Sequence, residues 1–402
     1  MRYQRTLAAV GAVIIVVGAY VAGYQAGAGR ARAGMSGFEL LREVRRLVDT
    51  RYVDRRATDD QLLYGAARGM LDTLGDPYSR FMDPAAFKEF QAASAGTFSG
   101  IGITMELVGG AVVVASPIPG TPAERAGLLA GDRILRIDDR PTRDMPLQRA
   151  VALIRGPEGT VVHLTVGRAG RTAQIAVTRG VIHAPSVQGE EVLDAASRAR
   201  LHRLGVAYLR ILTFDQTTGR EFHDALWRVA GSAPRGLILD LRSNGGGLVD
   251  SALRVADEFV PSGPIVSTVD RNGKRTTEYA TGAARYRRPL VVLVNEYTAS
   301  ASEILAGALQ DDHLGTLIGV GTFGKGIVQT VFSLPYGAGA AITTYQYLTP
   351  AGRVIHHKGL TPDVAAGSRL EGRPPEDVRR IQGAQLQRAI EILERRPARS
   401  AP

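Results

Sequence analysis

A run of five apolar residues followed by a helix-like pattern is the feature that most restricts the fold of this chain. Residues 290–294 read Leu-Val-Val-Leu-Val, a length and composition typical of a buried strand. Residues 295–298 interrupt the run, and a helical pattern opens at Ala299. The sequence therefore predicts a strand, a sharp turn and a helix, which is a unit of an α/β fold.

Ser300 stands at the start of this predicted helix. A serine at such a position is usually an N-cap. The same position lies beside unpaired backbone N–H groups and the positive end of the helix dipole, both of which suit a developing oxyanion. Ser300 is therefore a candidate nucleophile as well as a candidate cap. Ser302 lies about 200° further around the helix, so the two serines cannot face the same group.

A single lysine, Lys325, stands between two glycines in the loop of residues 321–326. A phosphate-binding Walker loop would need Ser or Thr directly after the lysine, whereas Gly326 follows here. Burial would disfavour the ammonium form and lower the pKa of Lys325, and a neutral amine could then act as general base. Ser300 and Lys325 together predict a dyad that needs no histidine.

A second strand and turn place three glycines in a row. Residues 237–241 read as a buried strand, and the loop Arg-Ser-Asn-Gly-Gly-Gly at 242–247 leads into a helix. Consecutive glycines let backbone N–H groups approach a ligand closely, and the dinucleotide-binding fingerprint lacks its last glycine here. We therefore predict an oxyanion hole, with the N–H of Ala301 as first donor and that of Gly246 as second.

The N-terminus carries an uncharged stretch between Arg5 and Arg30. It is long enough to cross a bilayer core of roughly 30 Å, and its flanking arginines are typical of a secretory signal or signal anchor. Residues 1–30 are predicted to form an uncleaved anchor, with the remaining chain exported. Cleavage near Ala26 or Ala28 is the alternative.

Composition limits the remaining possibilities. The chain has 402 residues, 45% of them hydrophobic, and no cysteine, so an exported core must be stable without disulfides. The formal net charge of +10 does not indicate nucleic-acid binding, because the arginines are dispersed and no basic run is interleaved with aromatics. No pattern calls for a metal or a cofactor.

These patterns divide the chain into five predicted regions. Residues 1–30 form the anchor, 36–96 a helical segment with apolar residues at three- and four-residue intervals, and 97–181 a β-rich insert. Residues 182–370 form the α/β core, and 371–402 a C-terminal helix and tail. Strands are expected at 112–115, 134–137, 161–166, 172–177, 205–209, 237–241 and 316–320, and helices at 147–154, 217–229, 248–259 and 378–393.

The β-rich insert resembles a PDZ domain. The resemblance is carried by Pro-Ala-Glu-Arg-Ala-Gly-Leu from residue 122, followed by Gly-Asp-Arg-Ile-Leu-Arg-Ile from residue 131. It implies that the amides of Ser99, Gly100, Ile101 and Gly102 receive a C-terminal carboxylate while the peptide adds as a strand to the module's edge. A packing module with a degenerate groove is the alternative.

Three further motifs, in order, resemble the carboxyl-terminal processing proteases, also known as tail-specific proteases or peptidase family S41. They are Asp-Leu-Arg-Ser-Asn-Gly-Gly-Gly from residue 240, Thr-Ala-Ser-Ala-Ser-Glu-Ile from 298 and Thr-Phe-Gly-Lys-Gly-Ile-Val-Gln from 322. The resemblance runs from about residue 38 to 363. It implies an α/β protease core of the ClpP/crotonase kind, with Ser300 as nucleophile, Lys325 as base and Gln329 supporting the lysine. Val320 departs from the pattern, since such enzymes often carry an acidic residue there.

The support of Lys325 by Gln329 carries a structural condition. Residues four apart are about 13 Å apart in an extended strand but about 6 Å apart across one helical turn. The role that the resemblance implies for Gln329 therefore predicts a bend between these two residues.

The resemblance also implies what the chain does. It would be a serine endopeptidase that cuts exported proteins near C-termini captured by the PDZ domain. It would lie in a bacterial cell envelope, anchored in the inner membrane with the protease domain in the periplasm, or be secreted if the signal is cleaved. Its partners would be protein tails and the membrane, with a homo-oligomer or a regulatory adaptor protein left open and no nucleic acid. A catalytically silent PDZ-bearing scaffold is the alternative.

Overall fold

The computed structural model describes residues 37–54, 58–232 and 234–395. The chain divides into two compact units, residues 1–75 and residues 76–402. The predicted anchor at residues 1–30 lies outside the described residues. Among the helices that the structure does describe, none is both long and apolar enough to span a bilayer.

The first unit contains the helices predicted from the apolar spacing, α2 (Gly37–Arg51) and α3 (Asp59–Asp72). Thr58 and Gln61 form a capping box at the start of α3, which fixes where that helix begins. No side chain of either helix is fully buried in the described structure, and both predicted helices are confirmed.

The second unit opens with β1 (Arg80–Met82) and α4 (Pro84–Ser94). Asp83 is the N-cap of α4 and Pro84 stands in its first turn, as their order in the sequence predicts. The β-rich insert follows, with β2 (Thr97–Gly100) pairing antiparallel to β9 (Gly180–His183) at its two ends.

The insert is a sheet with two short helices. Its strands run in the order β3-β4-β5-β7-β8, with β6 (Arg140–Pro141) paired to β5. They are β3 (Ile103–Val108), β4 (Ala111–Pro117), β5 (Arg133–Ile137), β7 (Val161–Arg168) and β8 (Arg171–Thr178), with helices α5 (Pro122–Arg125) and α6 (Leu147–Ile154). One apolar cluster, including Val112, Ile134 and Val162, forms its own core. Within the described residues the edge strand β3 pairs with β4 and with no other strand, which leaves its other edge available for strand addition.

The α/β core is built on a six-stranded sheet in the order β10-β11-β12-β15-β16-β19. Its strands are β10 (Val187–Gln188), β11 (Val206–Ile211), β12 (Gly236–Asp240), β15 (Leu290–Val294), β16 (Thr316–Gly319) and β19 (Val364–Ala365). All neighbours pair in parallel except β10 with β11. The apolar runs read from the sequence as buried strands are therefore confirmed as central strands covered on both faces.

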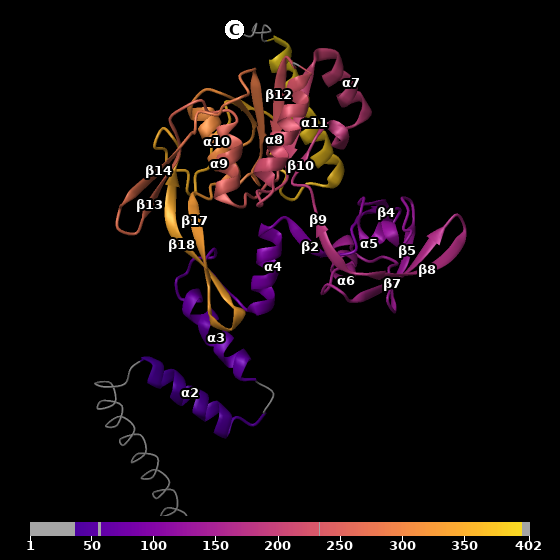
Figure 1. Cartoon of the computed structure of the whole chain (residues 1–402), viewed down its shortest axis with the longest axis vertical. Coiled ribbons are helices and arrows are strands. Elements are labelled where there is room, and N and C mark those ends of the chain that lie inside the picture. Colours follow the sequence, from indigo (N-terminus) through magenta and orange to yellow (C-terminus); the bar gives the residue numbers. More distant parts are fainter. Residues whose placement is uncertain (1–36, 55–57, 233, 396–402) are drawn as a thin grey trace, which may run out of the picture. The chain divides into compact units, whose positions relative to one another are not determined.

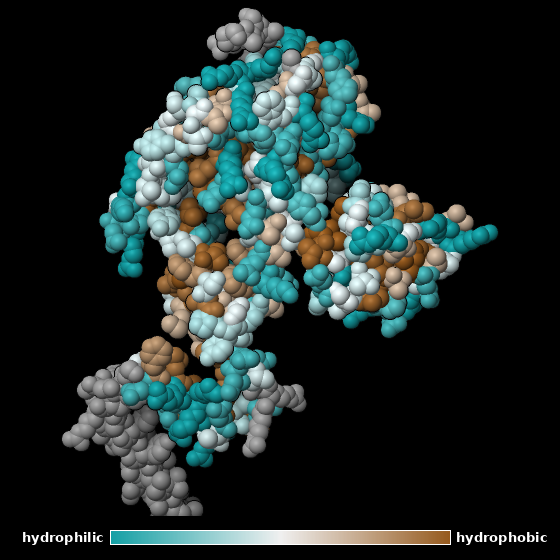
Figure 2. Space-filling model, viewed as in Figure 1, coloured by the Kyte–Doolittle hydropathy of each residue, from teal (hydrophilic) through white to brown (hydrophobic). Residues whose placement is uncertain are grey.

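Helices cover the two faces of this sheet (Figure 1). One layer holds α8 (Thr218–Gly231), α9 (Val249–Asp257) and α10 (Ala301–Asp311); the other holds α7 (Ala195–Leu204) and α11 (Pro375–Arg395). In β15, Val292 faces the first layer and Val291 the second, following the two-residue period of a strand. Figure 2 shows hydrophilic side chains over much of the face on which α8 and α9 lie, as expected for amphipathic helices.

A second sheet, which the sequence reading missed, pairs β1 with β18 (Gly339–Leu348), and β18 with β13 (Pro264–Asp270) and β17 (Ile327–Ser333). Strand β14 (Arg275–Tyr279) pairs with β13. Several of these strands are half-exposed and begin in glycine-rich sequence, so they lack the apolar runs that reveal the central strands. The sheet matters to the site because β17 directly follows the Lys325 loop and β1 lies beside β18.

Candidate active site

Ser300 lies in the turn between β15 and α10, where the sequence predicted it. It is the N-cap residue of α10 and has φ 59° and ψ −120°. A non-glycine residue at positive φ is strained, and such strain persists where the surrounding structure holds it. The carbonyl of Ser300 accepts a hydrogen bond from the buried Tyr347 hydroxyl at 3.1 Å. The turn therefore places the half-buried Ser300 at a sharp strand-to-helix junction, a geometry that also occurs at the nucleophile elbows of hydrolases.

A buried carboxylate, Glu303, holds this turn and the lysine loop together. Its Oε2 accepts the backbone N–H groups of Ser300 and Lys325, each at 2.9 Å. Its Oε1 accepts the N–H of Gly324 at 2.8 Å and the hydroxyl of Thr322. Because one oxygen binds both, the backbone nitrogens of Ser300 and Lys325 lie within twice 2.9 Å of each other. The folded backbone thus brings together two residues that are 25 positions apart in the sequence.

Sequence reasoning did not assign a role to Glu303. The available signal was its position three residues after Ser300, which is that of the acidic member of a capping box. Burial raises the pKa of Glu303, and the hydrogen bonds from Thr322, Gly324, Ser300 and Lys325 oppose that rise. A carboxylate with four converging donors is best satisfied when it is ionised, because a protonated oxygen loses acceptor capacity.

Ser302 packs inside the core, as expected if Ser300 is the serine that faces the site. Its side chain is fully buried, and its hydroxyl donates to the carbonyl of Asn244 at 3.0 Å. This confirms the geometric argument that one serine of the pair would pack inside.

The Lys325 side chain is half-buried and lies over an aromatic ring. Its Nζ is 4.6 Å from the ring centroid of Tyr78, close enough for a cation–π contact. Burial lowers the pKa of Lys325, the positive charge of Arg80 lowers it further, and Asp76 opposes the shift. The direction is the one required of a lysine that acts as a general base.

No hydrogen bond joins Lys325 Nζ to Ser300 Oγ or to Gln329 anywhere in the part of the chain that the structure describes. The amide of Gln329 instead donates to the Thr343 hydroxyl at 3.1 Å. The pairing of β17 with β18 is irregular between Val328 and Gln329, and Lys325 precedes the strand. The backbone thus departs from a regular strand in the segment where a bend was expected, and the supporting role of Gln329 stays a prediction.

The segment of residues 76–80, which leads into β1, contacts the side chain of Lys325. Asp76 accepts the Ser79 hydroxyl at 2.6 Å, and Ser79 Oγ accepts the N–H of Thr343 at 3.0 Å. These bonds fix Tyr78 beside the second sheet, where its ring meets Lys325. The sequence placed this segment only within the helical region at residues 36–96, and its contact with the site was missed.

The two predicted oxyanion donors lie together. A Cβ placed on Gly246 would be 2.8 Å from Ser300 Cβ and 2.9 Å from Ala301 N, so this glycine packs directly against the turn. The N–H of Ala301 has no hydrogen-bond partner among the described residues, whereas the N–H of Gly246 donates to Asn244 Oδ1 at 2.9 Å. The Ala301 donor is free in this structure, and the Gly246 donor would have to exchange partners.

A buried ion pair supports the glycine turn. Asp240, at the end of β12, accepts hydrogen bonds from the backbone and guanidinium of Arg242 and from the Tyr208 hydroxyl. Arg242 also donates to the Gln382 carbonyl and the Gln385 side chain of α11. The predicted C-terminal helix therefore contacts the core at the base of this turn.

Two of the predicted carboxylate-binding residues of the insert lie in a strand, and the other two lie in the connection that follows it. Ser99 and Gly100 belong to β2 and pair with β9, while Ile101 and Gly102 connect β2 to the edge strand β3. The Ser99 hydroxyl donates to the carbonyl of Gly156 at 2.7 Å, and Ile101 is buried. Their peptide-binding role stays a prediction.

Comparisons with known proteins match three parts of the chain. Residues 205–366 match peptidase family S41, residues 113–168 match the PDZ domain, and residues 21–86 match the N-terminal domain of the activating protease CtpB. The chain is 37% identical over 355 residues to the carboxyl-terminal-processing protease of Synechocystis, covering 86% of this chain and 80% of that protein. It is 36% identical over 338 residues to the carboxy-terminal processing protease CtpA of Bacillus subtilis, covering 84% and 70%.

A solved structure shows the same fold. It is that of a putative S41 protease from Bacteroides fragilis, with a TM-score of 0.51 and 15% sequence identity, covering 85% of this chain and 91% of that one.

Proposed function

Because this chain belongs to the carboxyl-terminal processing proteases of peptidase family S41, a family of serine peptidases, we propose that Ser300 is its nucleophile and Lys325 its general base. The observation that supports this pairing most strongly is the shared carboxylate of Glu303, which binds the backbone N–H groups of both residues through one oxygen. Ser300 also sits in the strained turn at the N-terminus of α10.

The proposed reaction proceeds in two halves. Ser300 Oγ attacks the scissile carbonyl while neutral Lys325 takes its proton, and the oxyanion receives the N–H of Ala301. The proton then passes to the leaving amine, which departs as the C-terminal fragment and leaves an acyl group on Ser300. Water attacks this ester and gives its proton to Lys325. Lys325 then returns the proton to Ser300 Oγ as the ester bond breaks, which releases the remaining substrate as a carboxylic acid and restores the enzyme.

The resting geometry adds a step before the first attack. Lys325 Nζ lies over Tyr78 in this structure, so the amine must turn away from the ring to reach Ser300 Oγ. Gly246 must likewise release Asn244 before its N–H can serve the oxyanion. Gln329 is proposed to support Lys325 once it has turned.

We further propose that the PDZ domain captures the substrate's C-terminus. The open edge of β3 would take the peptide as an added strand, and the amides of residues 99–102 would receive its carboxylate. The protease is proposed to be exported and anchored in the inner membrane by residues 1–30, with its substrates in the periplasm. A homo-oligomer or an adaptor protein remains a proposed partner.

Cleavage of an unstructured protein, with products identified by mass, tests the enzyme. Ser300→Ala and Lys325→Ala should abolish cleavage while circular dichroism shows an unchanged fold. Lys358→Ala is the matched control, because Lys358 is an exposed lysine of a neighbouring loop, and it should cut normally. Substrate turnover by the Ser300→Ala protein would contradict the proposed mechanism.

A second substrate, lacking its last residues and ending in an amide, tests the capture of C-termini separately. It should be cut more slowly by the same enzyme, through a higher KM. Equal rates of cleavage for both substrates would count against capture by the PDZ domain. They would leave the proposed roles of Ser300 and Lys325 unaffected. Protease protection of the full chain in spheroplasts tests the location: digestion from outside is expected, and protection would contradict export.

A further inference from the structure

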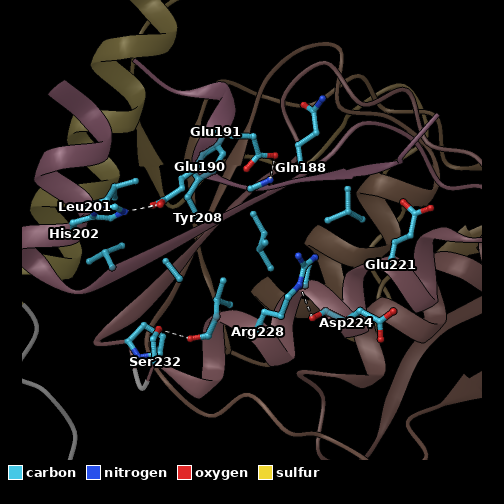
Figure 3. A pocket seen from close by; sticks show the side chains of 18 of the residues that line it. Gln188, Glu190, Glu191, Leu201, His202, Tyr208, Glu221, Asp224, Arg228 and Ser232 are labelled. Carbon is cyan, nitrogen blue, oxygen red and sulfur yellow. Dashed lines mark hydrogen bonds and ion pairs between the residues drawn. The ribbon is translucent and has the colours of Figure 1, made fainter. Parts of the chain in front are cut away.

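A large groove lies at the outer edge of the central sheet (Figure 3). Its lining includes no residue of the turn at Ser300 or of the loop of Lys325. Its volume is about 1010 Å³, comparable with the largest ligand pockets of proteins. It is bounded by η1 (Glu190–Val192) and α7 on one side and by α8 on the other, with β10 and β11 between them. We term this space the β11 edge groove.

The strand at the base of the groove has an incomplete partner. Residues Val187 and Gln188 of β10 pair with Ile211 and Arg210 of β11, and the chain then leaves the sheet at Gly189. The first four residues of β11 therefore have a neighbour only on the β12 side, in the part of the chain described here.

The period of the strand shows which main-chain groups face the groove. Leu212 N donates to Ser186 O, on the β10 side, so even-numbered residues of β11 direct their N–H and C=O outward. Val206 and Tyr208 thus point their main-chain groups into the groove, although these residues are only 5% and 3% exposed. Buried backbone groups are nearly always hydrogen-bonded, yet none of these has a protein partner within the described structure. Two such residues at strand spacing match the hydrogen-bonding pattern of an extended peptide.

The walls of the groove are apolar. Ala207 of β11 and Ala225 and Val229 of α8 line one side, and Leu201 of α7 lines the other. An added strand would point alternate side chains toward these two walls.

The rim of the groove is acidic in a chain whose formal net charge is +10. The lining includes four carboxylates, Glu190, Glu191, Glu221 and Asp224, and two guanidinium groups, Arg228 and Arg235. His202 pairs with Glu190, and His183 pairs with Glu221 at 2.8 Å. In Figure 3, Glu190 and Glu191 lie on one wall and Asp224 on the other. The Asp224 carboxylate makes no hydrogen bond or ion pair within the residues described, so it is available to a cation.

We propose that the β11 edge groove binds an extended, basic segment of a partner polypeptide, which adds to β11 as an antiparallel strand in line with β10. The unpaired groups of Val206 and Tyr208 bind its main chain, and the acidic rim selects lysine or arginine side chains. This docking site is separate from the PDZ domain and from Ser300, so it holds a partner by an internal segment and needs no free C-terminus.

The test uses the full chain carrying Ser300→Ala, so that the probe stays intact. The probe is the octapeptide Lys-Val-Lys-Val-Lys-Val-Lys-Val, acetylated and amidated so that it offers no carboxylate to the PDZ domain. Isothermal titration calorimetry measures its binding, and hydrogen exchange of residues 206–209 reports its place. We expect binding with slowed exchange at these residues. Absence of binding, or slowed exchange only at the open edge of β3 (residues 103–108), would overturn the proposal.

Matched probes and variants separate strand addition from loose charge attraction. Methylating the backbone nitrogens of one alternate set of residues should abolish binding, and methylating the other set should spare it, because only one set faces β11. Glu191→Gln with Asp224→Asn should weaken binding about three- to tenfold, whereas Glu89→Gln, at an exposed site on α4, should not. Equal binding by both methylated probes, or by a probe with glutamate in place of lysine, would overturn the proposal.

Discussion

Replacing Glu303 with glutamine tests whether one carboxylate holds the nucleophile and the base in place. Its Oε2 accepts the N–H groups of Ser300 and Lys325, and its Oε1 accepts from Gly324 and Thr322. A glutamine amide has a single acceptor oxygen, so its NH2 must face one of these pairs of donors. The Thr322 hydroxyl can turn to accept while an N–H cannot, so the amide nitrogen should occupy the Oε1 position.

The cost follows from the bonds lost. A buried Gly324 N–H left without an acceptor costs about 1–3 kcal/mol. Converting two charge-assisted hydrogen bonds to neutral ones costs about 1 kcal/mol each. Glu303→Gln should therefore lower the free energy of unfolding by about 3–5 kcal/mol. If a third of this loss falls on the geometry of the site, kcat/KM should fall about tenfold, since about 1.4 kcal/mol is a factor of ten.

Glu296→Gln is the matched control, because Glu296 is also buried and lies in the same turn. Its Oε1 accepts the N–H of Leu370, but its Oε2 has no partner in the described structure, so an amide nitrogen can stand there at little cost. Urea unfolding and peptide hydrolysis measure both variants. Equal losses in the two proteins, or no loss in Glu303→Gln, would refute the reasoning.

Four other predictions concern the same site. The pH profile of kcat/KM should rise as Lys325 loses its proton, at a pH below that of an ordinary lysine because burial lowers its pKa. Tyr78→Leu removes the cation–π stabilisation of the Lys325 ammonium, so it should move this rise to lower pH by about 0.5–1 unit. Tyr78→Phe keeps an aromatic ring and should leave the profile unchanged. Identical profiles for Tyr78→Leu and the unmodified protein would contradict the contact. Gly246→Ala should abolish hydrolysis, because the φ of this residue is 97° and the new Cβ would lie 2.8 Å from the Cβ of Ser300. A Cβ on Gly245 meets nothing within 4 Å, so Gly245→Ala is the control and should hydrolyse peptide normally. An active Gly246→Ala enzyme would refute the packing of this glycine against the turn. Ser302→Ala should lower the free energy of unfolding by about 1 kcal/mol in a thermal melt yet retain hydrolysis, and its inactivity would reopen the choice of serine.

The sequence was most informative where the chain is most buried. The central strands and the turn at Ser300 could be predicted because a strand covered on both faces must be a continuous apolar run. The second sheet could not, because half-exposed strands such as β14 and β17 show no such run. The buried strands and the site residues next to them in the sequence were therefore easier to predict. The site residues that only the second sheet brings together were harder.

The same limit explains what was missed at the site. Glu303 looks like a capping residue until the fold brings the loop of Lys325 onto both of its oxygens. Tyr78 lies 247 positions before Lys325, and only the pairing of β1 with β18 places it there. No local pattern encodes either contact.

Covalent labelling of the intact chain with a serine-directed fluorophosphonate, mapped by tandem mass spectrometry, tests the central claim most directly. We expect one adduct, on Ser300, which is absent in Ser300→Ala and forms much more slowly in Lys325→Ala. An adduct on another residue, or labelling that does not depend on Lys325, would contradict it.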